Sequence, residues 1–397
     1  MAPSVGTATA MWRAAFGSSV LGSECVPITD AAGRVTAGPV RARLSAPAVP
    51  CAAMDGIAVL AGDTLSSVVG AGRFDVVDTG DPLPPGRDAV VMREHLRRRP
   101  DGSVHLREPA RSGQHVRQVG ESVLAGEELV PAGRVLRPAD LAAAAAGGLP
   151  ALDVRRRPVV TIVPTGDEVR PLGTDLAPGE LLDTNSLMLA ATLRSLGCVV
   201  RVTAIQPDEP ALIAAAVRDA DADLVLVLAG SSAGRDDHTA HVIRSLGTVV
   251  VQGVAVRPAH PVLLGVLHTG VPVIGVPGYP VSAALAVELF AVPLLADLQG
   301  RRLDPPRPVP ARLRSAVPSR AECEEYVLLT LHEDGSAEPL ARGAGAQTAL
   351  ARADAVLRID AGSAGFDAGE RVMAHLTDAP GWAGTPEVRT LRRVTAV

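Results

Sequence analysis

Residues 224–237 read LVLVLAGSSAGRDD, five apolar residues followed by a loop of small residues that ends in two carboxylates. An unbroken apolar run of this length is typical of a strand that is buried on both faces. Similar strands are expected at 158–163, 199–205, 248–251, 262–267 and 271–276, and helices at 185–196, 211–220, 239–246 and from 281 onward. This alternation predicts a doubly wound, mostly parallel α/β sheet over residues 156–300.

The flanking regions differ from this α/β core in composition and in the length of their apolar runs. Residues 51–130 contain short apolar runs separated by Gly, Pro and Asp, which is typical of a small β domain. Residues 1–50 together with 131–155 are expected to form an N-terminal linker domain of helical and β segments. A proline-rich linker at 301–310 leads to residues 308–397, whose short strands and glycine turns predict a small C-terminal β barrel or a sandwich. The chain is therefore expected to be a multidomain α/β plus β protein.

Composition and charge argue against several classes of protein. The net charge of −5 argues against a general nucleic-acid binder. The longest apolar run, 281–298, is interrupted by Glu288, Pro293 and Asp297, so no membrane span is expected. The four cysteines have no CxxC spacing and are expected to be reduced thiols of a cytoplasmic protein. All 38 basic residues are arginine, so a site that usually contains lysine must be filled differently here.

Polar loops follow four of the expected strands. These loops contain Thr165, Gly166, Asp167 and Glu168; Gly230, Ser231, Ser232 and Gly234; Arg257 and His260; and Pro277, Gly278, Pro280 and Ser282. In open α/β sheets, ligands bind at the carboxyl ends of the strands. Glycines let backbone N–H groups approach an anion, and a helix N-terminus near Ser282 favours one. Each loop alone could be an ordinary turn, but four at one edge indicate a site for a phosphate-bearing ligand.

Carboxylates beside these loops point to a metal ion. Glu168, Asp236 and Asp237 would suit Mg²⁺ that bridges protein oxygens to ligand phosphates; the alternative is that they are solvated acids at loop tips. Arg257 and His260 would place cationic donors next to the anion, although a single histidine is more often a packed surface residue. No zinc-ligand spacing, P-loop or GxSxG motif is present.

At these loops the sequence resembles the MoeA family of molybdopterin molybdenumtransferases, which includes the E domain of gephyrin. The resemblance covers nearly the whole chain and rests on eight motifs in the family's order. They are AMDGIAV (53–59), TGDPLPPGRDAVV (79–91), RQVGES (117–122), TGDE (165–168), DTN (183–185), AGSSAGRDD (229–237), RPAHP (257–261) and PGYPVS (277–282).

The resemblance implies the last step of molybdenum cofactor synthesis, in which molybdate is inserted into the dithiolene of adenylylated molybdopterin and AMP leaves. It also implies a MogA-like α/β domain, and a homodimer with a shared active site to which the partner chain contributes Asp55 and Thr79. By position, the catalytic residues would be Asp55, Thr79, Glu168, Asp208 and Asp237. The substrate-binding residues would be Thr165, Gly166, Asp167, Asn185, Gly230, Ser231, Ser232, Gly234, Arg257, His260, Pro277, Gly278, Pro280 and Ser282, with Mg²⁺ at Glu168, Asp236 and Asp237.

Several positions depart from the family pattern. Ser231 replaces a glycine and Tyr279 the commoner asparagine, and a subgroup of the family resembles this chain at both. Ser122 stands where aspartate is usual, and Ala259-His260 replaces Gly-Lys, so that a permanent cation becomes a titratable imidazole. Two alternatives therefore stay open: a MoeA-like paralogue recruited to another phosphorylated or nucleotide substrate, and a non-catalytic scaffold of the gephyrin kind.

Overall fold

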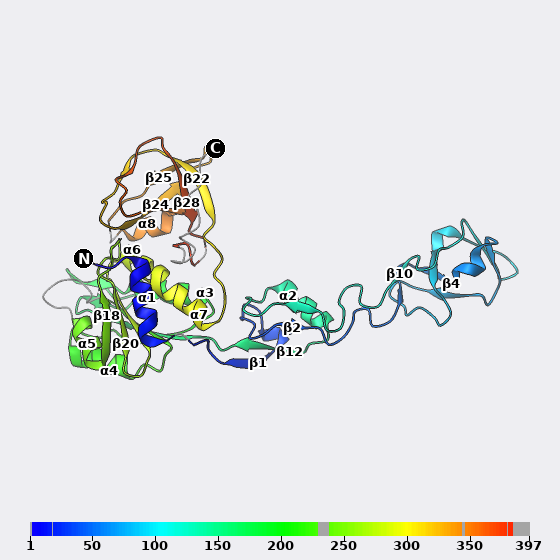
Figure 1. Cartoon of the computed structure of the whole chain (residues 1–397), viewed down its shortest axis with the longest axis horizontal. Coiled ribbons are helices and arrows are strands. Elements are labelled where there is room, and N and C mark those ends of the chain that lie inside the picture. The colour runs from blue at the N-terminus through cyan, green and yellow to red at the C-terminus, as the bar shows by residue number, and fades with distance from the viewer. Residues whose placement is uncertain (1, 18, 229–237, 344–345, 379, 384–397) are drawn as a thin grey trace. The chain divides into compact units, whose positions relative to one another are not determined.

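The structure, a computed structural model, describes residues 2–17, 19–228, 238–343, 346–378 and 380–383. It divides into two units, whose elements are labelled in Figure 1. The main unit comprises Met1–Gly22 and Arg155–Val397, and the N-terminal unit comprises Ser23–Val154.

A six-stranded sheet forms the centre of the main unit (Figure 1). The strands lie in the order β16 (Val199–Val202), β13 (Val159–Pro164), β17 (Leu224–Leu228), β21 (Pro272–Val276), β20 (Leu263–Leu267) and β18 (Gly247–Gln252). The first four are parallel, whereas β20 is antiparallel to both β21 and β18. Because β18 therefore runs in the same direction as the parallel strands, the loops after β13, β16, β17, β18 and β21 all leave at one edge.

Helices cover both faces of this sheet because its strands are apolar on both. In β17, Leu224, Leu226 and Leu228 belong to one buried cluster, and Val225 and Val227 belong to another. The first cluster includes residues of α1 (Val5–Phe16), α3 (Thr184–Ser195), α6 (Pro280–Ala286) and α7 (Val292–Leu298), and the second those of α4 (Pro210–Arg218) and α5 (His238–Leu246). The expected doubly wound, mostly parallel sheet is confirmed, with β20 reversed.

The N-terminal helix α1 packs on this sheet. Trp12 is 1% exposed, and its indole N–H donates to the carbonyl of Gly265 in β20 at 2.7 Å. The ring of Phe16 meets the Trp12 ring edge-on, with 5.2 Å between centroids. The expected N-terminal domain, 1–50 with 131–155, thus differs from the structure in its first 22 residues, which belong to the main unit.

The apolar helix Pro280–Leu298 consists of α6, a π-helical turn η4 (Val287–Ala291) and α7. By length and composition alone it could cross a membrane. However, 89% of its most apolar window is buried inside the protein, as in the central helix of a folded domain.

A closed five-stranded barrel forms the C-terminal part of the main unit. Its strands follow the circular order β24 (Glu324–Leu331), β25 (Ser336–Pro339), β22 (Pro308–Leu313), β28 (Arg371–Leu376) and β26 (Ala355–Ile359), and β26 pairs again with β24. The expected barrel is therefore confirmed. Strand β19 (Val256–Arg257), from the loop after β18, pairs in parallel with β24 and joins the α/β domain to the barrel. The remaining elements here are α8 (Gln347–Arg352), β23 (Val317–Pro318), β27 (Gly365–Phe366), β14 (Val169–Arg170) and β15 (Leu181–Leu182).

The N-terminal unit consists of small sheets and one α-helix, α2 (Pro138–Ala146). The sheet β6-β4-β7 is formed by β6 (Phe74–Val77), β4 (Gly56–Val59) and β7 (Ala89–Met92). A second sheet has the order β5-β9-β8, with β5 (Val68–Val69), β9 (Val104–Leu106) and β8 (Leu96–Arg98). The other strands are β1 (Ser23–Pro27), β2 (Val40–Arg41), β3 (Cys51–Ala52), β10 (Val116–Arg117), β11 (Glu128–Val130) and β12 (Ala151–Arg155), and the 3₁₀ turns are η1 (Ile28–Asp30), η2 (Ala61–Thr64) and η3 (Arg93–His95).

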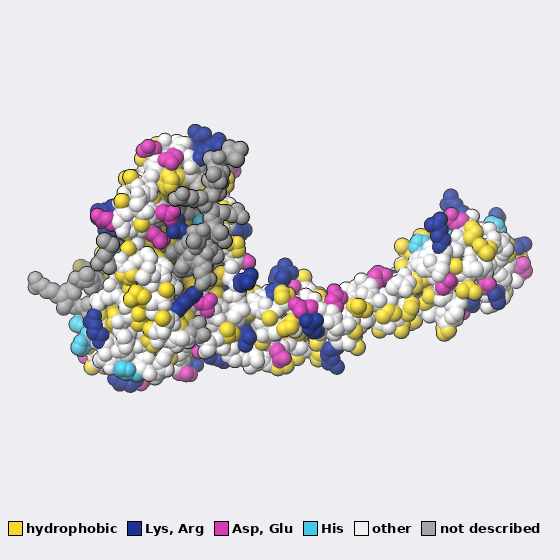
Figure 2. Space-filling model, in the orientation of Figure 1, with side chains coloured by type: hydrophobic (Ala, Val, Ile, Leu, Met, Phe, Trp, Pro, Cys, Tyr) yellow, Lys and Arg dark blue, Asp and Glu magenta, His cyan; other side chains and the backbone are white. Residues whose placement is uncertain are grey.

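On the face drawn in Figure 2, acidic and basic side chains of the described residues are interspersed rather than gathered by sign. This distribution agrees with the net charge of −5.

Candidate active site

The loop after β13 is held against the end of β17. The backbone N–H and the hydroxyl of Thr165 both donate to the carbonyl of Leu228, at 3.0 and 2.9 Å. The N–H of Gly166 donates to the carbonyl of Gln206 at 3.1 Å, and Gly166 has a φ of +134°. A Cβ at Gly166 would lie 2.9 Å from Oε2 of Glu168. Glycine is therefore required for this turn and for the position of the Glu168 carboxylate.

Asp167 and Asp208 join this loop to the one after β16. The backbone N–H of Asp167 donates to Oδ2 of Asp208 at 3.3 Å, and the N–H of Asp208 donates to Oδ1 of Asp167 at 3.2 Å. Arg170 supports the pair by donating to the carbonyl of Asp167 at 2.8 Å, and it also pairs with Glu180. The sequence did not single out Arg170, because an arginine that binds a nearby backbone carbonyl has no distinctive spacing.

The first turn of α3 contacts the loop after β21. Asp183 caps α3 by accepting a hydrogen bond from the N–H of Ser186 at 3.0 Å. The amide nitrogen of Asn185 donates to the carbonyl of Gly278 at 2.6 Å, while its Oδ1 is buried with no hydrogen-bond partner among the described residues. Because an unpaired buried carbonyl oxygen is costly, this atom is a candidate acceptor for a donor group of a ligand.

The loop 277–282 presents the N-terminus of the long helix Pro280–Leu298. Pro280 is its first residue, and the preceding Tyr279 makes no side-chain cap. Gly278 and Tyr279 are exposed, whereas Pro277 and Ser282 are buried. Among the described residues the first backbone N–H groups of the helix thus have no side-chain acceptor, and together with the helix dipole they favour an anion.

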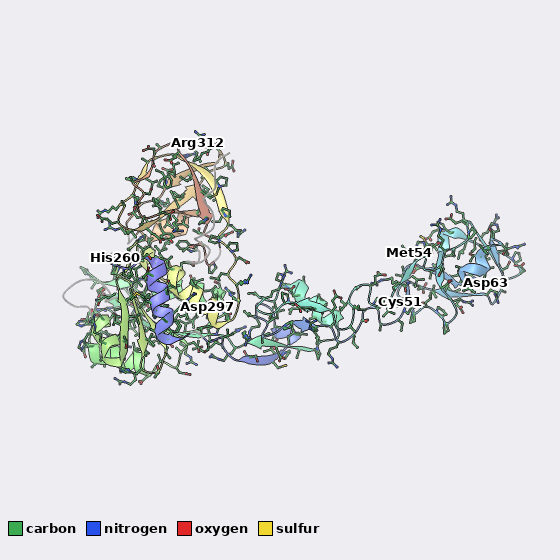
Figure 3. The ribbon with its side chains drawn as sticks, in the orientation of Figure 1. Cys51, Met54, Asp63, His260, Asp297 and Arg312 are labelled. Atoms are coloured by element: carbon green, nitrogen blue, oxygen red, sulfur yellow. The ribbon has the colours of Figure 1, made fainter. Side chains whose placement is uncertain are left out.

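Arg257 and His260 lie in the loop after β18, and Figure 3 labels His260 on the side of the α/β domain next to the barrel. Nδ1 of His260 lies 2.7 Å from the carbonyl of Val254, so Nδ1 is the protonated nitrogen and Nε2 is left to meet a ligand. Arg257 lies beside Cys323; burial raises the pKa of the Cys323 thiol, and the charge of Arg257 opposes that rise. The side chains of Arg257 and His260 therefore each already interact with another group of the protein.

Ala259, between these two residues, has a left-handed backbone with φ +80° and is 2% exposed. Ala259→Gly should change the stability of the main unit little, because relief of the strained φ offsets the greater flexibility of glycine in the unfolded chain. Ala259→Val should cost about 2 kcal/mol or more, since a branched side chain at positive φ is strained further. Denaturant unfolding of the three proteins checks this, and equal losses for Gly and Val would contradict it.

In the N-terminal unit, the structure brings Asp55 and Thr79 together. The N–H and the hydroxyl of Thr79 both donate to Oδ1 of Asp55, at 2.8 and 2.7 Å. These two hydrogen bonds, the hydroxyl's first, keep the pKa of Asp55 below its ordinary value, and the charge of Arg93 adds to the effect. Among the described residues no group donates a hydrogen bond to Oδ2 of Asp55, so an exposed, ionised carboxylate oxygen is available to a ligand.

Ser122, where the family pattern has aspartate, keeps an arginine partner. Nη2 of Arg117 donates to Oγ of Ser122 at 2.8 Å, and Nε donates to Oε1 of Glu121 at 3.1 Å. The serine therefore preserves one hydrogen bond to Arg117 but supplies no charge.

Six of the expected site residues lie outside the described part of the chain: Gly230, Ser231, Ser232, Gly234, Asp236 and Asp237. Among the residues that are described, no group of three or more His, Cys, Asp or Glu side chains could hold a metal ion.

Three family models match the chain in succession. The MoeA N-terminal region (domain I and II) matches residues 4–148, a probable molybdopterin binding domain matches 161–297, and the MoeA C-terminal region (domain IV) matches 310–377.

Similar proteins bear related names. The chain is 36% identical over 317 residues to molybdopterin molybdenumtransferase 2 of Mycobacterium tuberculosis, covering 71% of this chain and 76% of the relative. It is 31% identical over 302 residues to molybdopterin molybdenumtransferase of Haemophilus influenzae, covering 70% and 74%. The crystal structure of a molybdopterin biosynthesis MoeA protein from Pyrococcus horikosii superimposes with a TM-score of 0.84 at 29% identity, covering 95% of this chain and 99% of that one.

Proposed function

The chain belongs to the MoeA family of molybdopterin molybdenumtransferases, and we propose that it inserts molybdate into adenylylated molybdopterin in molybdenum cofactor biosynthesis. In this reaction water attacks the phosphoanhydride of the adenylylated pterin, whose P–O bond breaks so that AMP leaves. The two dithiolene sulfurs bind molybdenum in place of two molybdate oxygens, which take up protons and leave as water. The curated relatives favour this transferase over a paralogue with another substrate or a scaffold.

One observation carries the proposal: polar groups from several loops meet at one edge of the sheet. Thr165 is bonded to the end of β17, Asp167 to Asp208, and Asn185 to Gly278. The uncapped helix N-terminus at Pro280 lies in the same loop as Gly278 and would favour the phosphate of the pterin or of AMP. Fixed donors and dipoles of this kind stabilise the charge that develops on a leaving phosphate.

We assign the remaining roles by position in the motifs. The imidazolium form of His260, with a second proton on Nε2, and the guanidinium of Arg257 would supply positive charge beside the anions. Oδ1 of Asn185 would accept a hydrogen bond from the substrate. The glycines and serines of the 229–237 loop, which lie outside the described residues, would hold a phosphate through backbone N–H groups and hydroxyls.

The decisive test is complementation. Expression in a bacterial strain that lacks its own insertase should restore nitrate reductase activity, which requires the molybdenum cofactor. If the protein is expressed and folded but activity does not return, even with excess molybdate, the proposed function is wrong.

We also propose a homodimer in the cytoplasm, in which Asp55 and Thr79 of one chain complete the α/β site of the other. This proposal rests on the family resemblance and on the exposed, free carboxylate oxygen of Asp55.

Mixing two inactive variants should restore activity if the site is shared. In randomly exchanged dimers of Asp55→Ala and Asp237→Ala chains, half of the dimers are mixed and each has one intact site, so about a quarter of the sites should recover. Activity of the mixture, with subunit exchange verified by labelled chains, is the measurement. If the subunits exchange but activity does not return, Asp55 and Asp237 belong to the site of the same subunit.

We propose that Mg²⁺ binds at Glu168 together with Asp236 and Asp237, and lends charge to the substrate phosphates. In its favour, Glu168 is an exposed carboxylate at the site edge, next to the Asp167–Asp208 pair. Calorimetry should then show that Mg²⁺ tightens AMP binding about tenfold or more, and that Asp236→Asn with Asp237→Asn removes this effect. If Mg²⁺ tightened AMP binding equally in the double variant, we would conclude that Asp236 and Asp237 are solvated acids at the loop tip.

A further inference from the structure

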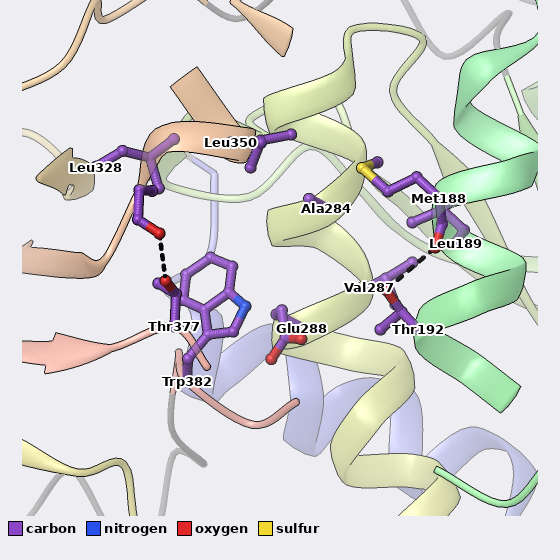
Figure 4. Close-up of a pocket in the computed structure, with 11 residues that line it drawn as sticks. Met188, Leu189, Thr192, Ala284, Val287, Glu288, Leu328, Leu350, Thr377 and Trp382 are labelled. Carbon is purple, nitrogen blue, oxygen red and sulfur yellow. Dashed lines mark hydrogen bonds between the residues drawn. The ribbon is translucent and has the colours of Figure 1, made fainter. Parts of the chain in front are cut away.

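A cavity of about 190 Å³ lies between the α/β domain and the barrel (Figure 4). Its walls come from α3, from α6 and η4, from β24 and from α8, and residues Thr377 and Trp382 complete them. The lining residues of α3 begin at Met188 and those of the long helix at Ala284, about one helical turn beyond the site residues Asn185 and Pro280. None of the described site residues lines the cavity.

Glu288 is the charged residue among those that line the cavity. It is 4% exposed, and its Oε2 accepts a hydrogen bond from the N–H of Gly381 at 2.7 Å. Burial raises the pKa of Glu288 to about 8, and hydrogen bonds from the backbone of Gly381 and Trp382 oppose the rise. None of the described residues that line the cavity is a cation, so none of them supplies a countercharge to the buried carboxyl group.

The buried carboxylate lies in a π-helical turn of the apolar helix. Pro293 has no N–H and cannot donate to the carbonyl of Leu289, so the regular α-helical ladder cannot continue through this point. The chain widens into η4 at Val287–Ala291, and Glu288 is part of that turn. Single π-helical turns of this kind often occur at functional sites.

The other polar groups of the cavity offer acceptors. The hydroxyl of Thr192 donates to the carbonyl of Met188 at 3.2 Å, and that of Thr377 donates to the carbonyl of Ala353 at 3.0 Å, as Figure 4 shows. Each hydroxyl therefore has only lone pairs left for a ligand. Together with the Glu288 carboxylate, they suit a group rich in N–H donors.

The remaining walls are apolar and include one aromatic ring. Leu328, Leu350 and Val287 line the cavity, and the Trp382 indole lies beside Glu288 in Figure 4. An apolar cavity of about 150 Å³ is large enough for benzene, so this one suits a ligand of one small ring. An indole face also attracts cations.

We propose that this cavity binds a small organic cation, a primary amine with an apolar body of about one ring, whose ammonium group pairs with Glu288 and whose body lies against Trp382. The ammonium donates to the carboxylate. Because the carboxyl group is largely protonated in the empty cavity, it must lose its proton when the ammonium binds, and the proton passes to the solvent. The inference does not depend on the proposed transferase activity.

Calorimetry of the full-length protein with benzylamine, in two buffers of different ionisation enthalpy, tests this proposal. At pH 7 we expect binding with release of nearly one proton, because Glu288 is protonated and benzylamine is already charged. At pH 9 this release should be lost and a small net uptake should replace it, since Glu288 is then already ionised and part of the free benzylamine is neutral. Benzyl alcohol, which has the same shape and no charge, should bind at least about tenfold more weakly.

Variants of the protein distinguish a loss of ligand binding from a loss of folding. Glu288→Gln should weaken benzylamine binding about tenfold or more and abolish proton release, while benzyl alcohol binding changes little. Glu333→Gln, at an exposed carboxylate of the barrel, is the matched control and should bind like the wild type. The proposal is overturned if benzylamine does not bind the folded wild type, if benzyl alcohol binds equally well, or if Glu288→Gln binds benzylamine as tightly as the wild type.

Discussion

Asp55→Ala should slow conversion of adenylylated molybdopterin to the cofactor by about 100-fold or more, while the N-terminal unit stays folded. Asp55 is exposed, so its removal leaves no cavity. Its Oδ1 is already occupied by both donors of Thr79, so its other oxygen is the one that can act on a substrate. The rate is measured with purified protein, and circular dichroism reports folding.

Asp101→Ala is the matched control for this experiment. Asp101 lies in the same unit and accepts hydrogen bonds from the N–H and hydroxyl of Ser103, at 2.9 and 2.6 Å, which also lower its pKa. It therefore accepts the same two kinds of hydrogen bond as Asp55 without a place in a family motif, and its replacement should leave the rate unchanged. If the Asp55→Ala and Asp101→Ala variants reacted at the same rate, Asp55 would have no role in the reaction.

The pH dependence of the rate should report the same pair. Since Thr79 lowers the pKa of Asp55, the carboxylate stays ionised further into the acid range than an ordinary aspartate. Thr79→Val removes the largest cause of this lowering, so the acidic limb of the rate profile should move to higher pH. Thr79→Ser keeps the hydroxyl and should leave the limb in place, whereas a shift with serine would point to a structural cause.

The position of the candidate site at one edge of the sheet could be predicted because the apolar pattern of the strands is unambiguous. The alternating leucines and valines of β17 are buried on both faces, and this forces helices onto both sides. The direction of β20 was not predictable, since an antiparallel strand covered on both faces has the same apolar composition as a parallel one. The reversed β20 does not affect the predicted site, because β18, which precedes the Arg257–His260 loop, runs in the parallel direction.

Contacts between distant segments could not be predicted from local pattern. Trp12 marks an amphipathic helix, but its partner Gly265 is 253 residues away, so the sequence could not show on which domain α1 packs. Glu288 likewise looked like an interruption of an apolar run, and its partner Gly381 is 93 residues away. The motifs singled out Asp167 but could not indicate that Asp208 would hold it through paired backbone hydrogen bonds.

Well above pH 8, Glu288→Gln should make the main unit about 5 kcal/mol more stable than the wild type. Burial raises the folded-state pKa of Glu288 from 4.5 to about 8. Between these two values the unfolded chain has already lost the proton that the folded chain still holds. Wild-type stability therefore falls as pH rises through this window and levels off above it. Glutamine keeps the shape and the hydrogen bond to Gly381 but does not titrate, so its stability should lack this fall.

Denaturant unfolding detected by tryptophan fluorescence reports on the main unit. The two tryptophans of the chain, Trp12 and Trp382, both lie in this unit with Glu288. At pH about 4 the carboxyl group is protonated in both states, and the two proteins should be nearly equally stable. The gap should then open by about 1.4 kcal/mol per pH unit until the folded carboxyl ionises. Glu333→Gln, exposed on the barrel, should show no such gap. Parallel stability curves for wild type and Glu288→Gln would mean that the backbone donors of Gly381 and Trp382 outweigh burial, and Glu288 would then be ionised at neutral pH.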